Sequence, residues 1–162
     1  MTPKAILLLL AALLTACAQT PPKEVPRPTG LYVPPSFNSE RTASIAGSIS
    51  RLIDTRQRAR LESIEYQEIP IAPEAEQPPV IVASGKRTLV VVCETNFRTA
   101  SDRTDIEVEF LAGHEYKLTC GTANLWVHNG SNFQVIDVTA GNRVVTTAFA
   151  PGRAYPPRGR LF

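Results

Sequence analysis

The chain has few of the residues that carry most catalytic and metal chemistry. Its 162 residues include two histidines, three cysteines, one tryptophan and one methionine. His114 and His128 lie in no recognisable catalytic motif, and Gly-x-Ser-x-Gly, His-Glu-x-x-His and a phosphate-binding glycine loop are all missing. The spacing of these histidines from Cys93 and Cys120 matches no common structural zinc pattern. We therefore expect no enzymatic activity, no bound metal and no cofactor.

An excess of one charge is also missing. The 17 Lys and Arg residues, of which Lys4 lies near the amino terminus, stand against 15 Asp and Glu residues. Nucleic-acid binding needs a basic stripe, so nucleic acid is not expected as a partner. One short stretch is basic, and its guanidinium groups would suit the phosphate oxygens of anionic lipid or lipopolysaccharide. Because Asp54 and Glu62 interrupt it, a solvated loop is the favoured interpretation. Its members are Arg51, Arg56, Arg58 and Arg60.

Only one long hydrophobic run is present, the ten residues 5–14, and it is too short to span a bilayer as a helix. With Lys4 before it and small residues after it, residues 1–16 have the layout of a secretory signal peptide. The end of this segment, Leu14-Thr15-Ala16-Cys17, resembles the lipobox of bacterial lipoproteins. The resemblance implies that the signal is cut before Cys17 and that this residue carries acyl chains, palmitate among them, on its sulfur and on its new amino group. The alternative is an ordinary secreted protein whose Cys17 happens to lie near the cut.

The acyl chains of Cys17 would make the protein membrane-bound without a membrane span. Each buried methylene contributes about 0.8 kcal/mol, so one chain binds weakly while two or three bind almost irreversibly. Ala18 stands where an aspartate would, by resemblance to known sorting signals, retain a lipoprotein in the inner membrane. We therefore expect the protein at the outer membrane, with its folded domain facing the periplasm.

The composition divides the rest of the chain into a linker, one domain and a tail. Residues 17–40 are assigned to a lipidated, proline-rich linker, 41–150 to a β-sandwich domain and 151–162 to a basic, proline-rich tail. An extended polyproline path rises about 3.1 Å per residue, so some 20 residues would hold the domain up to about 60 Å from the lipid. A proline-rich docking motif is the alternative interpretation of this segment.

Beyond the linker the pattern favours strands. Carboxylates alternate with Ile106, Val108 and Phe110 across residues 105–110, as in a half-buried strand. Residues 88–93 are apolar on both faces and rich in valine, which is typical of a central strand. Further strands are expected over residues 42–49, 61–66, 116–120 and 144–149, with a helical turn as an alternative within 50–60 and a long surface loop over 68–79. The fold class predicted is all-β, an antiparallel β-sandwich of about seven or eight strands.

The strongest turn signal is the pair Asn129-Gly130, because both residues tolerate positive φ. Apolar alternation lies on either side of it, over residues 125–127 and 133–138. We therefore expect a hairpin whose two strands meet at this pair.

Cys93 and Cys120 each lie in the inward phase of a predicted strand, and the expected compartment is oxidising. If the strands 86–95, 104–111 and 115–120 follow one another in a single meander, the outer two lie about 9.6 Å apart and cannot be bridged. If the chain crosses between sheets at Ala112-Gly113, the two thiols can face each other. The alternatives are therefore a disulfide or two separately buried small side chains.

Trp126 is the main candidate for ligand contact. An exposed tryptophan on a sandwich can stack on a sugar ring, as in carbohydrate-binding modules. Its neighbours Leu125 and Val127 are both apolar, so the alternation does not show which way the indole points. A core position is the alternative.

Two further segments are informative, Gly85-Lys86-Arg87-Thr88-Leu89-Val90-Val91 and Phe110-Leu111-Ala112-Gly113-His114-Glu115-Tyr116-Lys117-Leu118. They resemble segments of small proteobacterial outer-membrane lipoproteins of unknown function, and the resemblance covers roughly residues 42–122. It implies a single β-sandwich without assigned enzymatic activity, and it carries over no functional residue.

The sequence therefore predicts a lipid-anchored, non-catalytic accessory lipoprotein of the cell envelope. Its partners would be the membrane, through the acyl chains of Cys17, and an envelope protein contacted through the sandwich. A module that binds peptidoglycan or another glycan through Trp126 is the alternative. An enzyme or enzyme inhibitor would require a cleft that brings His114 or His128 close to a carboxylate and a hydroxyl.

Overall fold

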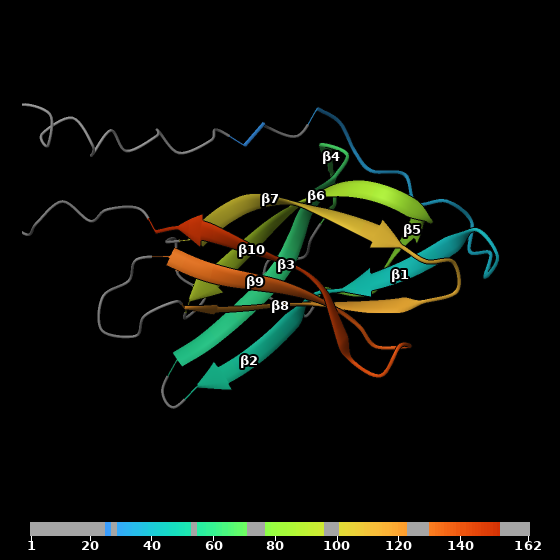
Figure 1. Cartoon of the computed structure of the whole chain (residues 1–162). Coiled ribbons are helices and arrows are strands. Elements are labelled where there is room, and N and C mark those ends of the chain that lie inside the picture. The colour runs from blue at the N-terminus through green and yellow to red at the C-terminus, as the bar shows by residue number, and fades with distance from the viewer. Residues whose placement is uncertain are drawn as a thin grey trace, which may run out of the picture.

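Two β-sheets pack face to face in a computed structural model that describes residues 25–26, 29–52, 55–70, 77–95, 101–122 and 130–152 (Figure 1). All regular elements in these residues are strands, five in each sheet. They are β1 (Thr42–Ala46), β2 (Ser48–Leu52), β3 (Thr55–Ile64), β4 (Gln67–Glu68), β5 (Val80–Ala83), β6 (Gly85–Thr95), β7 (Ser101–Phe110), β8 (Glu115–Thr122), β9 (Gly130–Asp137) and β10 (Arg143–Pro151).

The strand order confirms the predicted all-β sandwich. One sheet has the order β10-β9-β8-β1-β5, and the other has the order β2-β3-β6-β7 with β4 beside β3. Neighbouring strands are antiparallel except β1 and β8, which are parallel. The described strands number ten instead of seven or eight, because short strands occur where the sequence predicted one continuous strand or a turn.

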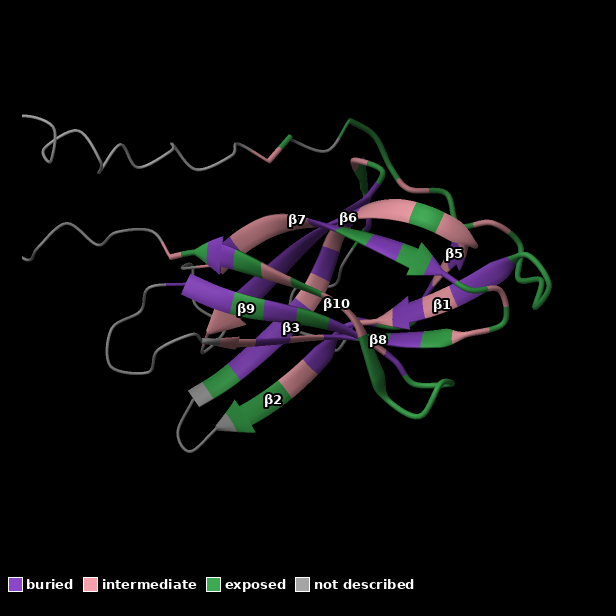
Figure 2. Cartoon of the chain, in the orientation of Figure 1, coloured by how far each residue is buried: buried purple, intermediate pink, exposed green. Residues whose placement is uncertain are grey.

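The core lies between the sheets and follows the predicted alternation. Ile106, Val108 and Phe110 of β7 are buried, whereas Glu107 and Glu109 are exposed (Figure 2). In β6, residues 89, 91 and 93 join the core, while Val90 and Val92 on the other face are also buried, at 0% and 2% exposure. Since β6 lies between β3 and β7, the prediction of a central strand is confirmed.

The helical turn considered within residues 50–60 is wrong for the described part of this stretch, because residues 50–52 belong to β2 and residues 55–60 belong to β3. Arginine, glutamine and alanine favour helices in isolation, but propensity is a weak influence beside tertiary pairing. Residues 57–64 of β3 pair with β6, and Ala59 and Leu61 turn inward to the core. The burial of this face outweighs the local helical preference.

The strand predicted over residues 42–49 is divided, because the chain passes from one sheet to the other at Gly47. A Cβ atom at this position would lie 2.5 Å from the carbonyl oxygen of Ala59. Only glycine permits so close an approach between backbones. The two halves are β1 and β2, which belong to different sheets.

The hairpin predicted around Asn129-Gly130 lies partly outside the described residues. Strand β9 begins at Gly130 and is paired with β8 on one edge and with β10 on the other. The second strand predicted for this hairpin, over residues 133–138, corresponds to β9. Residues 123–129, which include Trp126 and His128, lie outside the described residues. The first strand of the hairpin and the turn at Asn129 therefore stay predictions, and the described strand that precedes β9 in the chain and pairs with it is β8.

A crossing between sheets brings the two internal cysteines together. Strand β7 belongs to one sheet and β8 to the other, so the chain changes sheet at residues 111–114, as the bridged alternative requires. Cys93 of β6 and Cys120 of β8 form a disulfide, with a Cα–Cα distance of 5.9 Å. The bond therefore links the two sheets across the core.

The strap, defined as residues 29–40, lies against the sandwich although it was assigned to the linker. The Thr29 N–H donates to the Tyr66 carbonyl at 2.7 Å, and the Tyr32 hydroxyl donates to the Ile81 carbonyl at 2.9 Å. Upstream, the Arg103 guanidinium donates to the carbonyls of Val25 and Pro26 at 3.1 and 3.0 Å. The linker assigned to residues 17–40 is therefore fixed to the body over its described part, which shortens the spacer.

The predicted loop and the predicted tail are described in part. Within the predicted loop 68–79, residues 71–76 lie outside the described residues. Gln77 is buried, and its side-chain amide forms hydrogen bonds with both the N–H and the carbonyl of Leu61. The predicted tail is described only to residue 152. In the part of the chain that is described, no helix has the length and apolar character needed to cross a bilayer.

Candidate functional site

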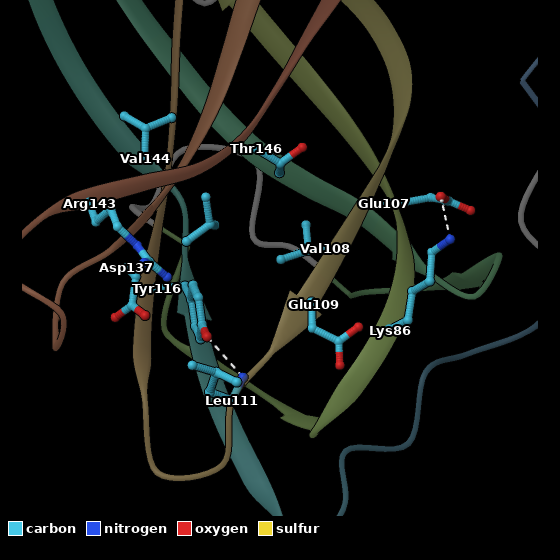
Figure 3. A pocket seen from close by; sticks show the side chains of 11 residues that line it. Lys86, Glu107, Val108, Glu109, Leu111, Tyr116, Asp137, Arg143, Val144 and Thr146 are labelled. Carbon is cyan, nitrogen blue, oxygen red and sulfur yellow. Dashed lines mark hydrogen bonds and ion pairs between the residues drawn. The ribbon is translucent and has the colours of Figure 1, made fainter.

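A groove of about 560 Å³ opens on the side of the sandwich where β7 and β10 face each other (Figure 3). It lies where the carboxyl end of β7 passes the start of β10, close to the turn between β9 and β10. The lining residues are Lys86, Glu107, Val108, Glu109, Leu111, Tyr116, Asp137, Arg143, Val144, Val145 and Thr146.

The topology explains why the groove lies here. Strands β7 and β10 are edge strands of opposite sheets, and each is paired on one side only among the described strands. The register of β10 on β9 shifts between Val144 and Thr146, which marks a β-bulge. A bulge bends a strand locally and increases its twist. We attribute the separation of the two edges at this point to that bend.

The groove has an apolar floor and a lip that is partly apolar. Val108 is buried at 1% exposure, and Val145 packs against the core. Leu111 and Val144, in contrast, are 45% and 46% exposed. Large apolar side chains that stay in water beside a concave surface are typical of binding sites.

Tyr116 connects this floor to the crossing between sheets. Its hydroxyl accepts a hydrogen bond from the Leu111 N–H at 2.9 Å, and its ring meets Phe110 edge to face with centroids 4.8 Å apart. Between them, Gly113 has a φ of 76°, which favours glycine. Burial raises the pKa of Tyr116 above its ordinary value of 10.0, so its hydroxyl stays protonated at neutral pH. This arrangement resembles the tyrosine corner of other sandwiches.

A buried carboxylate, Asp137, joins the crossing to the β9–β10 turn. Its side chain is 0% exposed, and its oxygens contact His114 Nδ1 at 2.8 Å and the Ala140 N–H at 2.9 Å. Burial alone would raise the pKa of Asp137, but the bonds from Ala140 and His114 and the positive charges of His114 and Arg143 hold it below its ordinary value of 3.8. Because an ionised carboxylate can only accept, His114 Nδ1 carries the proton.

Charges of both signs surround the groove. Lys86 and Glu107 form an ion pair at 2.8 Å with both side chains more than 60% exposed, so it stabilises the fold little. The hydrogen bond and the charge of Glu107 raise the pKa of Lys86 above 10.5. Figure 3 shows Glu109 on the same side as Lys86 and Arg143 on the opposite side. A ligand in the groove would therefore meet a carboxylate on one side and a guanidinium on the other.

The His114–Asp137 pair meets half of the condition set for catalysis. A general base needs an orienting carboxylate and a nucleophile within hydrogen-bond reach. Asp137 supplies the first, but among the described side chains no hydroxyl is bonded to the second ring nitrogen of His114. The same described ranges contain no group of three His, Cys, Asp or Glu side chains placed to hold a metal ion.

The basic stretch is not a solvated loop. Arg58 and Arg60 lie on β3, and both bond the Glu94 carboxylate, Arg58 Nε at 2.8 Å and Arg60 Nε at 2.7 Å. Burial opposes the ionisation of Glu94, but these two arginines outweigh it and lower its pKa below 4.5. Since Arg58 and Arg60 already share an internal partner, they are poor candidates for binding lipid phosphates.

Of the predicted site residues, the structure describes only the two bridged cysteines. Cys17 and Trp126 lie outside the described residues, so lipidation and stacking stay predictions. The groove was not predicted because its residues come from five separate strands and from the crossing after β7, and no local spacing relates them. The nearest signal in the sequence was Ala112-Gly113, which was considered as a crossing between the sheets. No protein-family model, curated protein or solved structure matches the chain.

Proposed function

We propose that the protein is a lipid-anchored, non-catalytic accessory protein of the cell envelope, and that its sandwich contacts another envelope protein through the β7–β10 groove. The groove is the observation that carries this proposal, together with the lipobox-like Leu14-Thr15-Ala16-Cys17. The anchor would place the protein at the outer membrane, and the groove supplies a contact site.

The groove suits an extended peptide segment better than a large rigid surface. Its two walls are strand edges, and an unpaired strand edge offers backbone donors and acceptors to an incoming strand. The floor around Val108 and Val145 would take an apolar side chain of that segment. Glu109 and Arg143 on opposite sides would orient it through charges of both signs.

Site-specific photocrosslinking in the native envelope tests this contact. A photoreactive amino acid replaces Val144, which is 46% exposed at the lip of the groove. We expect one protein adduct of defined mass from this position. The matched control is Gln134, which is exposed on β9 and does not line the groove.

A reversal of charge separates a specific contact from random capture. Arg143→Glu in the same photoreactive background should remove the adduct, because Arg143 lines the groove. An equal yield of the same adduct from Gln134, or an adduct that survives Arg143→Glu, would count against the groove.

The peptidoglycan-binding alternative has its own test, which uses Trp126. Co-sedimentation with purified peptidoglycan sacculi should be lost in Trp126→Ala and kept in Trp126→Phe if an aromatic ring stacks on a sugar. Binding that requires the ring, without a protein adduct at Val144, would favour the glycan-binding module over the adaptor. An indole that is shielded from aqueous quenchers in the native protein would argue against stacking.

A further inference from the structure

The strap holds the three most exposed large hydrophobic side chains among the described residues. Leu31, Val33 and Phe37 are 64%, 79% and 68% exposed. The strap runs along the outside of the sandwich in Figure 1, where it is drawn in blue. These side chains therefore form an apolar strip on one short surface segment.

The strip is held in place and does not collapse onto the body. Tyr32, between Leu31 and Val33, packs partly against the core, donates its N–H to the Glu68 carbonyl at 2.7 Å and its hydroxyl to the Ile81 carbonyl at 2.9 Å. Since successive side chains of an extended chain point to opposite sides, the inward position of Tyr32 directs Leu31 and Val33 outward. At the other end, the Asn38 N–H donates to the Thr42 hydroxyl at 2.9 Å and fixes the chain directly after Phe37.

The chain length places this strip close to the proposed anchor. The Arg103 guanidinium donates a hydrogen bond to the carbonyl of Val25, and Val25 lies only eight positions after Cys17 in the chain. A fully extended chain spans at most about 3.6 Å per residue, so Val25 lies within about 29 Å of the acylated cysteine. The strap continues directly from this point, and the nearest apolar phase available to it is the bilayer that holds the acyl chains.

We propose that Leu31, Val33 and Phe37 insert into the headgroup region of the membrane, so that the strap seats the sandwich on the bilayer in one orientation. This proposal rests on the lipid anchor at Cys17. Apolar side chains at such an interface are buried at the boundary between headgroups and acyl chains. In Figure 1 the strap passes over the top of the sandwich, whereas the turn between β9 and β10 lies at its lower edge.

Fluorescence quenching in vesicles tests the contact. Because Cys93 and Cys120 are bridged and Cys17 would be acylated, an introduced cysteine is the only free thiol. The mature lipidated protein, as Val33→Cys or Phe37→Cys, carries an environment-sensitive nitrobenzoxadiazole label in vesicles of phosphatidylethanolamine with some phosphatidylglycerol. We expect a blue-shifted emission and the loss of most of the signal when brominated lipids are present. Gln134→Cys, exposed on β9, is the control and should keep its signal.

The two measurements test the strip and the anchor separately. Flotation of the protein with the vesicles reports the anchor by itself, so a protein that fails to float contradicts both proposals. If the protein floats while the labels at 33 and 37 are quenched no more than the label at 134, the anchor stands and the strip is overturned. Shielding of these labels from iodide before lipid is added would instead indicate a contact with a second copy of the chain and would also overturn the strip.

Discussion

At the scale of single residues, Tyr116 shows how one polar atom fixes a change of sheet. The crossing at residues 111–114 has no regular pairing of its own, and the Leu111 N–H is bonded by the Tyr116 hydroxyl at 2.9 Å. A backbone donor left without a partner in a partly buried place costs about 1–3 kcal/mol. The hydroxyl thus decides whether the end of β7 and the adjoining wall of the groove keep their position.

Tyr116→Phe keeps the ring on Phe110 but removes the acceptor for Leu111. We expect the free energy of unfolding to fall by about 1–2 kcal/mol, measured by urea denaturation. Tyr66→Phe is the control, because the Tyr66 hydroxyl has no hydrogen-bond partner among the described residues. Equal stability of Tyr116→Phe and the wild type would show that this bond does not hold the corner.

Asp137 makes the stability of the folded protein depend on pH. Its pKa in the folded protein lies below the ordinary 3.8, so the folded state favours the ionised form. This contribution is present above the pKa of the unfolded chain and is lost as the pH falls through the lower pKa of the folded state. Protonation also removes the charge that pairs with His114.

Asp137→Asn should therefore unfold more easily at neutral pH, by about 1–3 kcal/mol, because the charge-assisted bond with His114 is lost. We expect the gap between wild type and variant to close as the pH falls below about 4, measured by urea denaturation at a series of pH values. Glu107→Gln, which alters an exposed carboxylate, serves as the control and should show a small gap throughout. A gap for Asp137→Asn that is independent of pH would contradict the assignment of an ionised, stabilising carboxylate.

At the scale of elements, the disulfide joins β6 of one sheet to β8 of the other, across a sequence separation of 27. Between the two cysteines lie β7 and the crossing that forms one end of the groove. A covalent link of this length restricts the unfolded chain and stabilises the fold by on the order of 3 kcal/mol in the chain-entropy model.

The double variant Cys93→Ala with Cys120→Ala should lose on the order of 3 kcal/mol in urea denaturation. Reducing agent should lower the stability of the wild type to a similar extent and leave the double variant unchanged, which makes the variant its own control. If a thiol assay shows the bond reduced while the urea midpoint of the wild type stays fixed, the cross-link does not stabilise the sandwich.

Some of these strands could be predicted from the sequence, and others could not. The alternation of Ile106, Val108 and Phe110 predicted β7 because it reports burial on one face, and this pattern is local. The close backbone contact at Gly47 and the pairing of β9 with β8 could not be predicted from the sequence, because both depend on residues distant in the chain. The groove is the extreme case, since its apolar floor joins β7, β8 and β10 and exists only after the sheets have packed.

At the scale of the whole molecule, two features would hold the sandwich close to a membrane. The acyl chains of Cys17 would supply the anchor, and the strap, tied by Arg103 and Tyr32, would limit the distance and set the orientation. The sequence predicted a long spacer because prolines favour an extended, solvated path. It could not show that the Arg103 guanidinium binds the carbonyls of Val25 and Pro26, because β7 lies far along the chain.

The anchor is the claim on which the proposed location, the strip and the approach of the groove to envelope partners all depend. Mass spectrometry of the intact protein purified from the envelope, followed by sequencing of its amino-terminal peptide, tests it most directly. We expect a chain that begins at Cys17, lacks residues 1–16 and carries the added mass of acyl chains on that residue. An unmodified thiol at Cys17, or a soluble chain that retains residues 1–16, would contradict the account.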